Sequence, residues 1–264
     1  MDIFSTWPTW SFIGILLLMM FLANETGFRT GRRPDQQESD SSRTVSNSFK
    51  ASIFGLVAFL LAFSFSITAA RHTLRRDVVL DEANAIGTCW LRAGLLNEPY
   101  TTDIRATLRR YVNLRLQYFE VAANPQKSTD TVKQMGIELD QLWNEVEEAV
   151  RADSSIARTS LIISSANDVI DLHSKRARAA ASHLEPIILM LLFVSVLVSS
   201  LLFGHSSGQT NRRHTGLWLA VNVLFSLVLY AVLDFDRPRQ GLVQVDHTPL
   251  IELQASINPE QKPD

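Results

Sequence analysis

The stretch IFGLVAFLLAFSFSITAA, residues 53–70, decides the fold because it contains no charged side chain over its whole length. As an α-helix at about 1.5 Å per residue it would be about 27 Å long, close to the roughly 30 Å hydrocarbon core of a bilayer. Three further uncharged blocks occur at residues 10–23, 187–203 and 217–233. With their flanks, the four blocks predict four transmembrane helices.

The overall composition is ordinary, and only the clustering of apolar residues identifies a membrane protein. The chain has 264 residues, 46% of them hydrophobic, and a formal net charge of −2. This near-zero charge gives no reason to expect a nucleic-acid partner. Asp2 is the only charge before the first block, which therefore lacks the basic region of a cleaved signal peptide, and we expect it to remain as an anchor. The single cysteine, Cys89, excludes an intramolecular disulfide and is expected to be a small buried apolar residue.

The segments between the apolar blocks define the expected organisation. A polar segment nearly free of large apolar residues separates the first two blocks, and a much longer, helix-forming segment separates the second from the third. No stretch shows the alternation of a strand. We predict an all-α, multi-pass membrane protein with about four transmembrane helices and an extramembrane helical bundle inserted between the second and third. The expected boundaries are a first transmembrane helix at 1–23, a flexible polar loop at 24–47, a second transmembrane helix at 48–70, the helical bundle at 71–183, a third transmembrane helix at 184–203, a short basic loop at 204–216, a fourth transmembrane helix at 217–235 and a C-terminal tail at 236–264.

The expected bundle has two outer helices that extend membrane helices and two inner helices with apolar stripes. The chain runs from the second membrane block into the bundle without a breaker, and we expect the last bundle helix to run on into the third block. The tail is punctuated by proline and is expected to pack as an extended segment. The two inner stripes are Ile104, Leu108, Tyr111, Val112, Leu114 and Tyr118, and Val132, Met135, Leu139, Leu142 and Val146.

Small side chains recur along one face of the second predicted membrane helix. Small residues let helix backbones approach closely, so this face indicates either close packing inside one subunit or an oligomer or pore-lining interface. The rings of Phe59 and Phe63 flank it beside the hydroxyls of Ser64 and Thr68, as in an aromatic constriction of an ion path, although aromatic residues in membrane helices more often face lipid. The candidate pore or helix-packing residues are Gly55, Ala58, Phe59, Ala62, Phe63 and Ser66.

Polar residues follow the second membrane block within roughly three helical turns, and a second polar group precedes the third block. If the two helices that carry them are antiparallel neighbours, carboxylates of one face bases of the other. Partly desolvated charges are costly unless they are paired, which favours a salt-bridge and amide network that clamps the bundle to its membrane helices. An ion-binding vestibule is the alternative. The candidates at this membrane boundary are Asp81, Glu82, Asn84, Asn167, Asp168, Asp171 and Arg176.

Signals for catalysis or for a bound metal are weak. His72, Asp168, Asp171 and His173 are residue types found in metal sites, but the chain has neither a His-x-x-x-His spacing nor a carboxylate-rich loop to support one. It also lacks a glycine-rich phosphate loop and a nucleophile elbow. We therefore expect no enzyme activity and no cofactor.

The basic residues bear on the orientation in the membrane. Those beside the termini and the bundle nearly equal in number those beside the two connecting loops. Charges on a long domain count for less in setting the orientation, and the N-terminus has no basic side chain. The pattern therefore favours a cytoplasmic location for the connecting loops.

Four stretches of the chain, in order, resemble the bestrophin-like family of bacterial membrane proteins. The short signatures DEANAIGT and LDxDRPxxG within them are specific to that family, and the resemblance covers nearly the whole chain. The stretches are ETGFRTGRR at 25–33, GLVAFLLAFSFSITAARHTLRRDVVLDEANAIGTCWLRAGLLNEPY at 55–100, ANDVIDLHSKRARAAASHLEPII at 166–188 and LDFDRPRQGLVQV at 233–245.

The resemblance implies a distant relation to bestrophins, which are pentameric anion-conducting channels with a pore lined by the second membrane helix. That helix corresponds to residues 51–70 here. The resemblance thus implies a homo-oligomer, a pentamer by analogy, that passes small inorganic ions across the lipid bilayer of the bacterial inner membrane. The alternative is a membrane-anchored helical sensing or scaffold module, because a bundle between two membrane helices also resembles chemoreceptor sensor domains.

Overall fold

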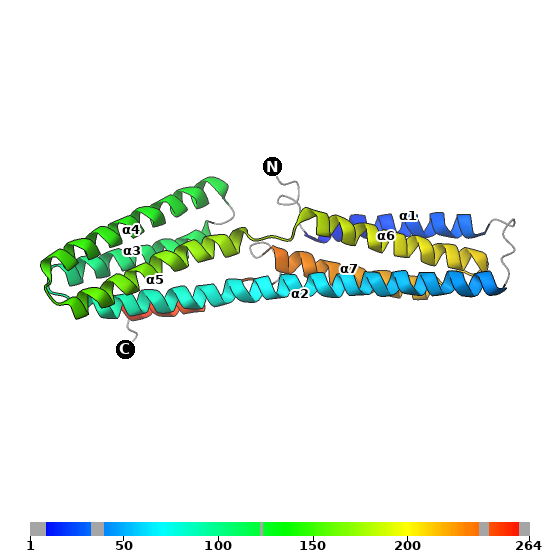
Figure 1. Ribbon diagram of the computed structural model, residues 1–264. Helices are drawn as coiled ribbons and strands as arrows, with labels where there is room; N and C mark the ends of the chain where they lie inside the picture. Colours follow the sequence, from blue (N-terminus) through cyan, green and yellow to red (C-terminus); the bar gives the residue numbers. More distant parts are fainter. Residues whose placement is uncertain (1–8, 33–39, 122–123, 238–242, 259–264) are drawn as a thin grey trace. The chain divides into compact units, whose positions relative to one another are not determined.

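The computed structural model describes residues 9–32, 40–121, 124–237 and 243–258, and every regular element among them is an α-helix, as predicted (Figure 1). The residues divide between two compact units: a membrane unit, Met1–His72 with His183–Gln244, and a bundle unit, Thr73–Ser182 with Val245–Asp264. The helices are α1 (Thr9–Gly31), α2 (Asp40–Ala93), α3 (Tyr100–Glu120), α4 (Pro125–Ala152), α5 (Ile156–Ala181), α6 (Pro186–Gln209), α7 (Thr215–Asp236) and α8 (Thr248–Ile257).

The membrane unit contains α1, the first part of α2, α6 and α7, and four helices of the described chain are long and apolar enough to cross a bilayer. Its interior is apolar: Leu16, Leu192 and Leu229, from three helices, are at most 1% exposed. Its outer surface is apolar as well, since Leu22 of α1 is 56% exposed and Leu224 of α7 is 59% exposed. Helices that are apolar both inside and outside are stable only where hydrocarbon surrounds them.

Helices α1 and α6 approach until their backbones touch. An added Cβ at Gly27 would lie 2.9 Å from the amide nitrogen of His205, and one at Gly204 would lie 2.8 Å from the carbonyl carbon of Asn24. Neither position has room for a side chain, so the contact requires glycine. Each helix carries a pair of glycines four residues apart at this contact: Gly27 and Gly31 on α1, Gly204 and Gly208 on α6.

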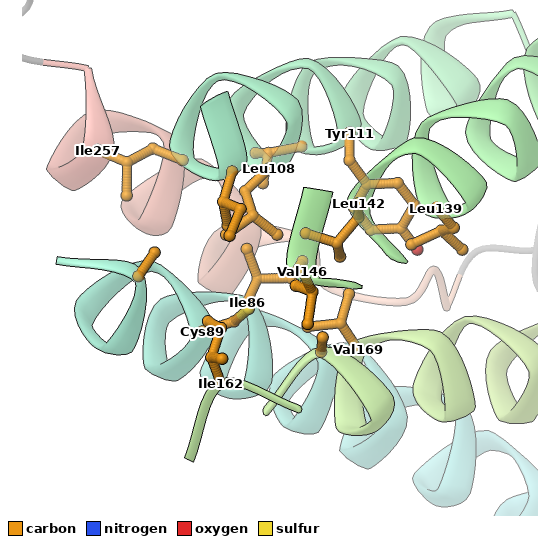
Figure 2. Packing of buried hydrophobic residues seen from close by; sticks show 14 of the residues in the cluster. Ile86, Cys89, Leu108, Tyr111, Leu139, Leu142, Val146, Ile162, Val169 and Ile257 are labelled. Atoms are coloured by element: carbon orange, nitrogen blue, oxygen red, sulfur yellow. The ribbon is translucent and has the colours of Figure 1, made fainter. Parts of the chain in front are cut away.

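The bundle unit packs the second part of α2 with α3, α4, α5 and α8 around one apolar core (Figure 2). The predicted inner stripes face this core, as the side chains of Ile104, Met135 and Leu142 show by being at most 1% exposed. Val132 departs from its stripe and is 42% exposed. Cys89 is buried, as expected, and burial raises the pKa of its thiol to about 11, so the thiol stays protonated at neutral pH.

Several boundaries differ from those expected from sequence. Helix α1 continues beyond residue 23 to Gly31 and α2 already begins at Asp40, so both ends of the expected polar loop at 24–47 are helical. Helices α6 and α7 likewise shorten the expected loop at 204–216 to residues 210–214. The tail was expected to be extended, but it contains α8, because a proline in the first turn starts a helix instead of preventing one.

Residues 182–185 are not helical and separate α5 from α6. The prediction that one helix continues from the bundle into the third membrane block is therefore wrong. Glu185 precedes the proline that begins α6, and its ψ of 134° lies outside the helical range, as expected for a residue before proline. The guanidinium of Arg75 donates to the carbonyl oxygens of Ala179 at 3.1 Å and Ser182 at 2.5 Å. Arg75 thereby satisfies carbonyls that the end of α5 leaves without helical partners.

Candidate functional site

The small-residue face of α2 points away from the other helices of its own unit. All six candidate residues on it are exposed, whereas Val57, Leu61, Ser64 and Thr68 on the opposite side are at most 2% exposed. A Cβ added to Gly55 would meet no atom within 4 Å. Close packing of these small residues inside one subunit, one of the two predicted alternatives, is therefore not seen. The other alternative, an oligomer or pore-lining interface, stays a prediction. The six residues are Gly55, Ala58, Phe59, Ala62, Phe63 and Ser66.

The aromatic pair on this face is preorganised by the helix. The rings of Phe59 and Phe63 stack with centroids 6.2 Å apart and planes 11° apart, and the side chains are 64% and 55% exposed. The hydroxyls of Ser64 and Thr68, expected beside these rings, lie on the buried side instead; Thr68 donates to the carbonyl oxygen of Ser64 at 3.1 Å. Among the six residues of the exposed face, Ser66 supplies the hydroxyl.

The second candidate site is a charged cluster in the interior of the bundle unit. Glu82 of α2 has 0% of its side chain exposed, and its Oε1 lies 2.6 Å from a guanidinium nitrogen of Arg115 on α3. Arg176 of α5 binds the other carboxylate oxygen. Tyr111 donates its hydroxyl to Glu82 at 2.7 Å. One buried carboxylate therefore joins three helices.

The charges of the cluster fix the protonation of its members. Burial alone would raise the pKa of Glu82, but the charges of Arg115 and Arg176 outweigh it and lower this pKa below its usual value, so the carboxylate is ionised. Burial, and then the charge of Arg115, lower the pKa of His173. The Nδ1 atom of His173 lies 3.1 Å from a guanidinium nitrogen of Arg115. Because a guanidinium only donates, Nδ1 accepts and the neutral ring carries its proton on Nε2.

Two of the seven residues predicted for the boundary network, Glu82 and Arg176, form this cluster. Asp81 makes only a half-exposed ion pair with Lys175, at 3.7 Å. The other four residues are exposed and do not join the cluster: Asn84, Asn167, Asp168 and Asp171. Asn167 and Asp168 line a shallow groove along α5.

Sequence reasoning missed the contribution of α3. Tyr111 belonged to a predicted apolar stripe, and Arg115 follows it by four residues, so both lie on the buried face of the helix. A basic residue on an otherwise apolar helical face is the signal that could have identified a buried ion pair. Among the described residues, His, Cys, Asp and Glu side chains nowhere gather in a group of three that could hold a metal ion.

Two buried carboxylates at the end of α7 bind the backbone of neighbouring segments. Asp236 accepts a hydrogen bond from the amide of Leu184 at 2.7 Å, and Asp234 accepts one from the amide of Val243 at 3.0 Å. Both belong to the LDxDRPxxG signature. These two aspartates thus hold the chain before α6 and after α7 in place.

These features define an all-helical membrane protein in which one long helix contributes to both a membrane unit and a helical bundle. The Bestrophin-like domain matches residues 17–250. The chain therefore belongs to the bestrophin-like family, as the four sequence stretches indicated.

Solved structures of a bacterial bestrophin homolog from Klebsiella pneumoniae share the fold. One, of an Ile-to-Thr variant, has a TM-score of 0.60 and 13% identity over 93% of this chain and 94% of that chain. Another, solved by zinc phasing, has a TM-score of 0.58 and 13% identity over 93% of this chain and 95% of that chain. Comparison with curated protein sequences gives no match.

Proposed function

We propose that this protein is a homo-oligomeric ion channel of the bacterial inner membrane, and that the exposed face of α2 lines the ion path between copies of the chain. One observation carries the proposal. The helix that the family resemblance assigns to the pore turns a face of small residues out of its own subunit. Such a face suits either close approach to an equivalent helix or a narrow path along it.

The composition of this face supports a contact with protein or ions over a contact with lipid. Elsewhere on the membrane unit the exposed side chains include large aliphatic ones, such as Leu18 and Leu22 of α1 and Leu224 of α7. On α2 the six-residue face carries small side chains apart from the two phenylalanines, whose rings are of the kind that narrow and dewet an ion path, and the large exposed side chains of Leu56 and Phe65, at 56% and 38%, lie beside this face.

The charged cluster supports a structural role for the bundle. Both oxygens of Glu82 are bound by arginine, and the hydroxyl of Tyr111 is donated to the same carboxylate. A carboxylate held in this way is a poor proton acceptor, since its pKa is lowered. The cluster instead fixes α2 against α3 and α5, which stabilises the helix that carries the proposed ion path.

Thiol modification during current recording tests the ion path. In planar bilayers containing Ser66→Cys protein, a positively and a negatively charged methanethiosulfonate reagent should change the current in opposite directions. Leu224→Cys, at an exposed position on α7, is the control and should not respond. The native Cys89 is buried and stays protonated, so it contributes little background. Absence of current at all salts and voltages would favour the sensing or scaffold alternative.

The mass of the detergent-solubilised protein tests the oligomer. Gly55→Leu introduces a bulky side chain on the exposed α2 face, and overpacking costs about 1–3 kcal/mol at each copy of an interface. We expect smaller species with unchanged helix content. Gly14→Leu is the matched control, because Gly14 is also exposed on a membrane helix and has no atom within 4 Å of an added Cβ. Equal masses for the two variants and the unmodified protein would contradict an interface at Gly55.

A further inference from the structure

Residues 245–258 form a strap on the bundle unit, and α8 makes up most of it. Leu250 is 0% exposed and Ile257, labelled in Figure 2, is 4% exposed, and both belong to the bundle core. These are the only two buried residues among the ten of α8. The side-chain amide of Gln254 also donates to Asn113 of α3 at 2.8 Å. A segment with so few buried side chains is of the kind that opens locally while the rest of a domain stays folded.

His247 anchors the start of the strap. Its imidazole stacks on the ring of Phe119 of α3, with centroids 3.3 Å apart and planes 17° apart. The Nδ1 atom is buried and has no hydrogen-bond partner among the described residues. A protonated imidazole carries N–H groups on both nitrogens, so protonation would leave a charged donor at Nδ1 without an acceptor. The docked strap therefore favours the neutral ring.

The charges around His247 add to this preference. The guanidinium carbon of Arg176 on α5 lies 5.0 Å from the centroid of the same Phe119 ring, so a positive charge stands close to the imidazole. The neighbouring carboxylate, Asp246, is exposed, accepts two hydrogen bonds inside the strap, and feels the opposite charge of Arg76 on α2. Burial and then Arg176 lower the pKa of His247 to about 4, and Asp246 offsets this only in part.

We propose that the strap is an acid-operated switch: protonation of His247 releases residues 245–258 from α3, while the other helices of the bundle unit stay packed. Release would expose the core surface that the two buried side chains of α8 cover at neutral pH. The charged cluster of Glu82, Arg115 and Arg176 keeps α2, α3 and α5 together, because the lowered pKa of Glu82 keeps its carboxylate ionised in mild acid. The switch lies in the bundle unit and does not depend on an ion path along α2.

Hydrogen exchange of the full chain in detergent, corrected for the intrinsic rate at each pH, measures the opening. At about pH 7.5 the amides of α8 should be less protected than those of α4. At about pH 5 the released strap binds a proton that the docked strap does not, and a pKa lowered from 6.5 to about 4 corresponds to a roughly 30-fold change in the opening equilibrium. The imidazole is partly exposed and solvent screens its charge, so we expect the protection factors of α8 to fall by about tenfold or more.

Two variants isolate the imidazole, with circular dichroism to confirm that each is folded. His247→Phe keeps a ring that can stack on Phe119 but cannot be protonated, so the fall in protection should vanish. If this new ring weakens docking at neutral pH, His247→Gln, which is also neutral, serves in the same test. His173→Gln is the matched control, because it removes a second partly buried imidazole, one that contacts Tyr111 and Arg115 in the charged cluster, and the fall should persist.

The outcomes decide between local release and other causes. A fall in α8 protection in the unmodified protein and in His173→Gln, but not in the His247 variants, supports the switch. Equal protection factors for α8 and α4 at both pH values would mean that the strap opens only with the whole bundle, and would overturn it. So would the absence of a fall in the unmodified protein, a fall that persists in the His247 variants, or one that disappears in His173→Gln. None of these measurements records current, so a negative result here leaves the proposed ion path unaffected.

Discussion

Removing the charge of Glu82 should destabilise the protein far more than removing the charge of its neighbour Asp81. Glu82 has none of its side chain exposed and is shared by Arg115, at 2.6 Å, and Arg176. Glu82→Gln keeps the size of the side chain but leaves two buried guanidiniums without their anion, and breaking a buried pair in this way costs about 3–5 kcal/mol. Asp81 and Lys175 are each 50% exposed and 3.7 Å apart, a pair worth at most about 1 kcal/mol.

Thermal unfolding of the full chain in detergent, followed by far-ultraviolet circular dichroism, measures the difference. A chain of this size changes its Tm by roughly 2–4 °C per kcal/mol, so Glu82→Gln should lower Tm by roughly 6–20 °C. The control Asp81→Asn should lower it by about 4 °C or less. Hydrogen exchange should place the loss in the bundle unit, in α2, α3 and α5, because the cluster joins these helices.

A second substitution tests whether excess positive charge is the cause. Adding Arg176→Gln to Glu82→Gln removes one of the uncompensated cations. The double variant should therefore be more stable than the sum of the single changes predicts, by a coupling of about 0.5–3 kcal/mol. Strict additivity, or a Tm for Glu82→Gln within about 2 °C of that for Asp81→Asn, would refute the reasoning.

Gly27→Ala should force α1 away from α6 and lower the Tm in detergent by several degrees, because overpacking costs about 1–3 kcal/mol, while Gly14→Ala, with no atom within 4 Å of the new Cβ, should not lower it. Equal stabilities would contradict the backbone contact. Arg75→Met should speed hydrogen exchange at the end of α5, where two carbonyls lose their donor, and unchanged exchange in that peptide would show that the cap is dispensable. Burial, and then the charge of Arg176, lower the pKa of His247 from 6.5 to about 4. Between pH 6.5 and pH 4 the imidazole of His247 therefore binds a proton in the unfolded chain but not in the folded chain. Stability should therefore fall as the pH drops from 7 to 4, and His247→Phe should flatten this part of the curve; an identical pH profile would exclude His247 as its source.

The membrane helices were predictable because uncharged blocks of spanning length leave few alternatives. The exposed face of α2 was also readable in part, since helical spacing alone places Gly55 and Ala62 on one side. Whether that side faced its own subunit was not readable, because this depends on the rotation of α2 about its axis. Only the structure identifies the side of α2 that faces its own subunit, because the side chains of Val57 and Leu61 are buried there.

The partners of Glu82 were only half predictable, for a similar reason. Arg176 could be placed opposite Glu82 because each follows or precedes a membrane block, which fixes an approximate register. Helix α3 has no such anchor, so the position of Arg115 depends on packing that a linear sequence does not encode directly. The segment after residue 23 was assigned to a loop from its polar composition, and this concealed the spacing of Gly27 and Gly31.

The glycine contact between α1 and α6 also sets an order of events during synthesis. Roughly 180 residues separate Gly27 from Gly204, and at about 5–20 residues per second the ribosome needs roughly 10–35 s to make them. Throughout this interval the glycine face of α1 lacks the helix that fits it. The nascent chain thus carries an unfilled helix contact until its third membrane helix has been made.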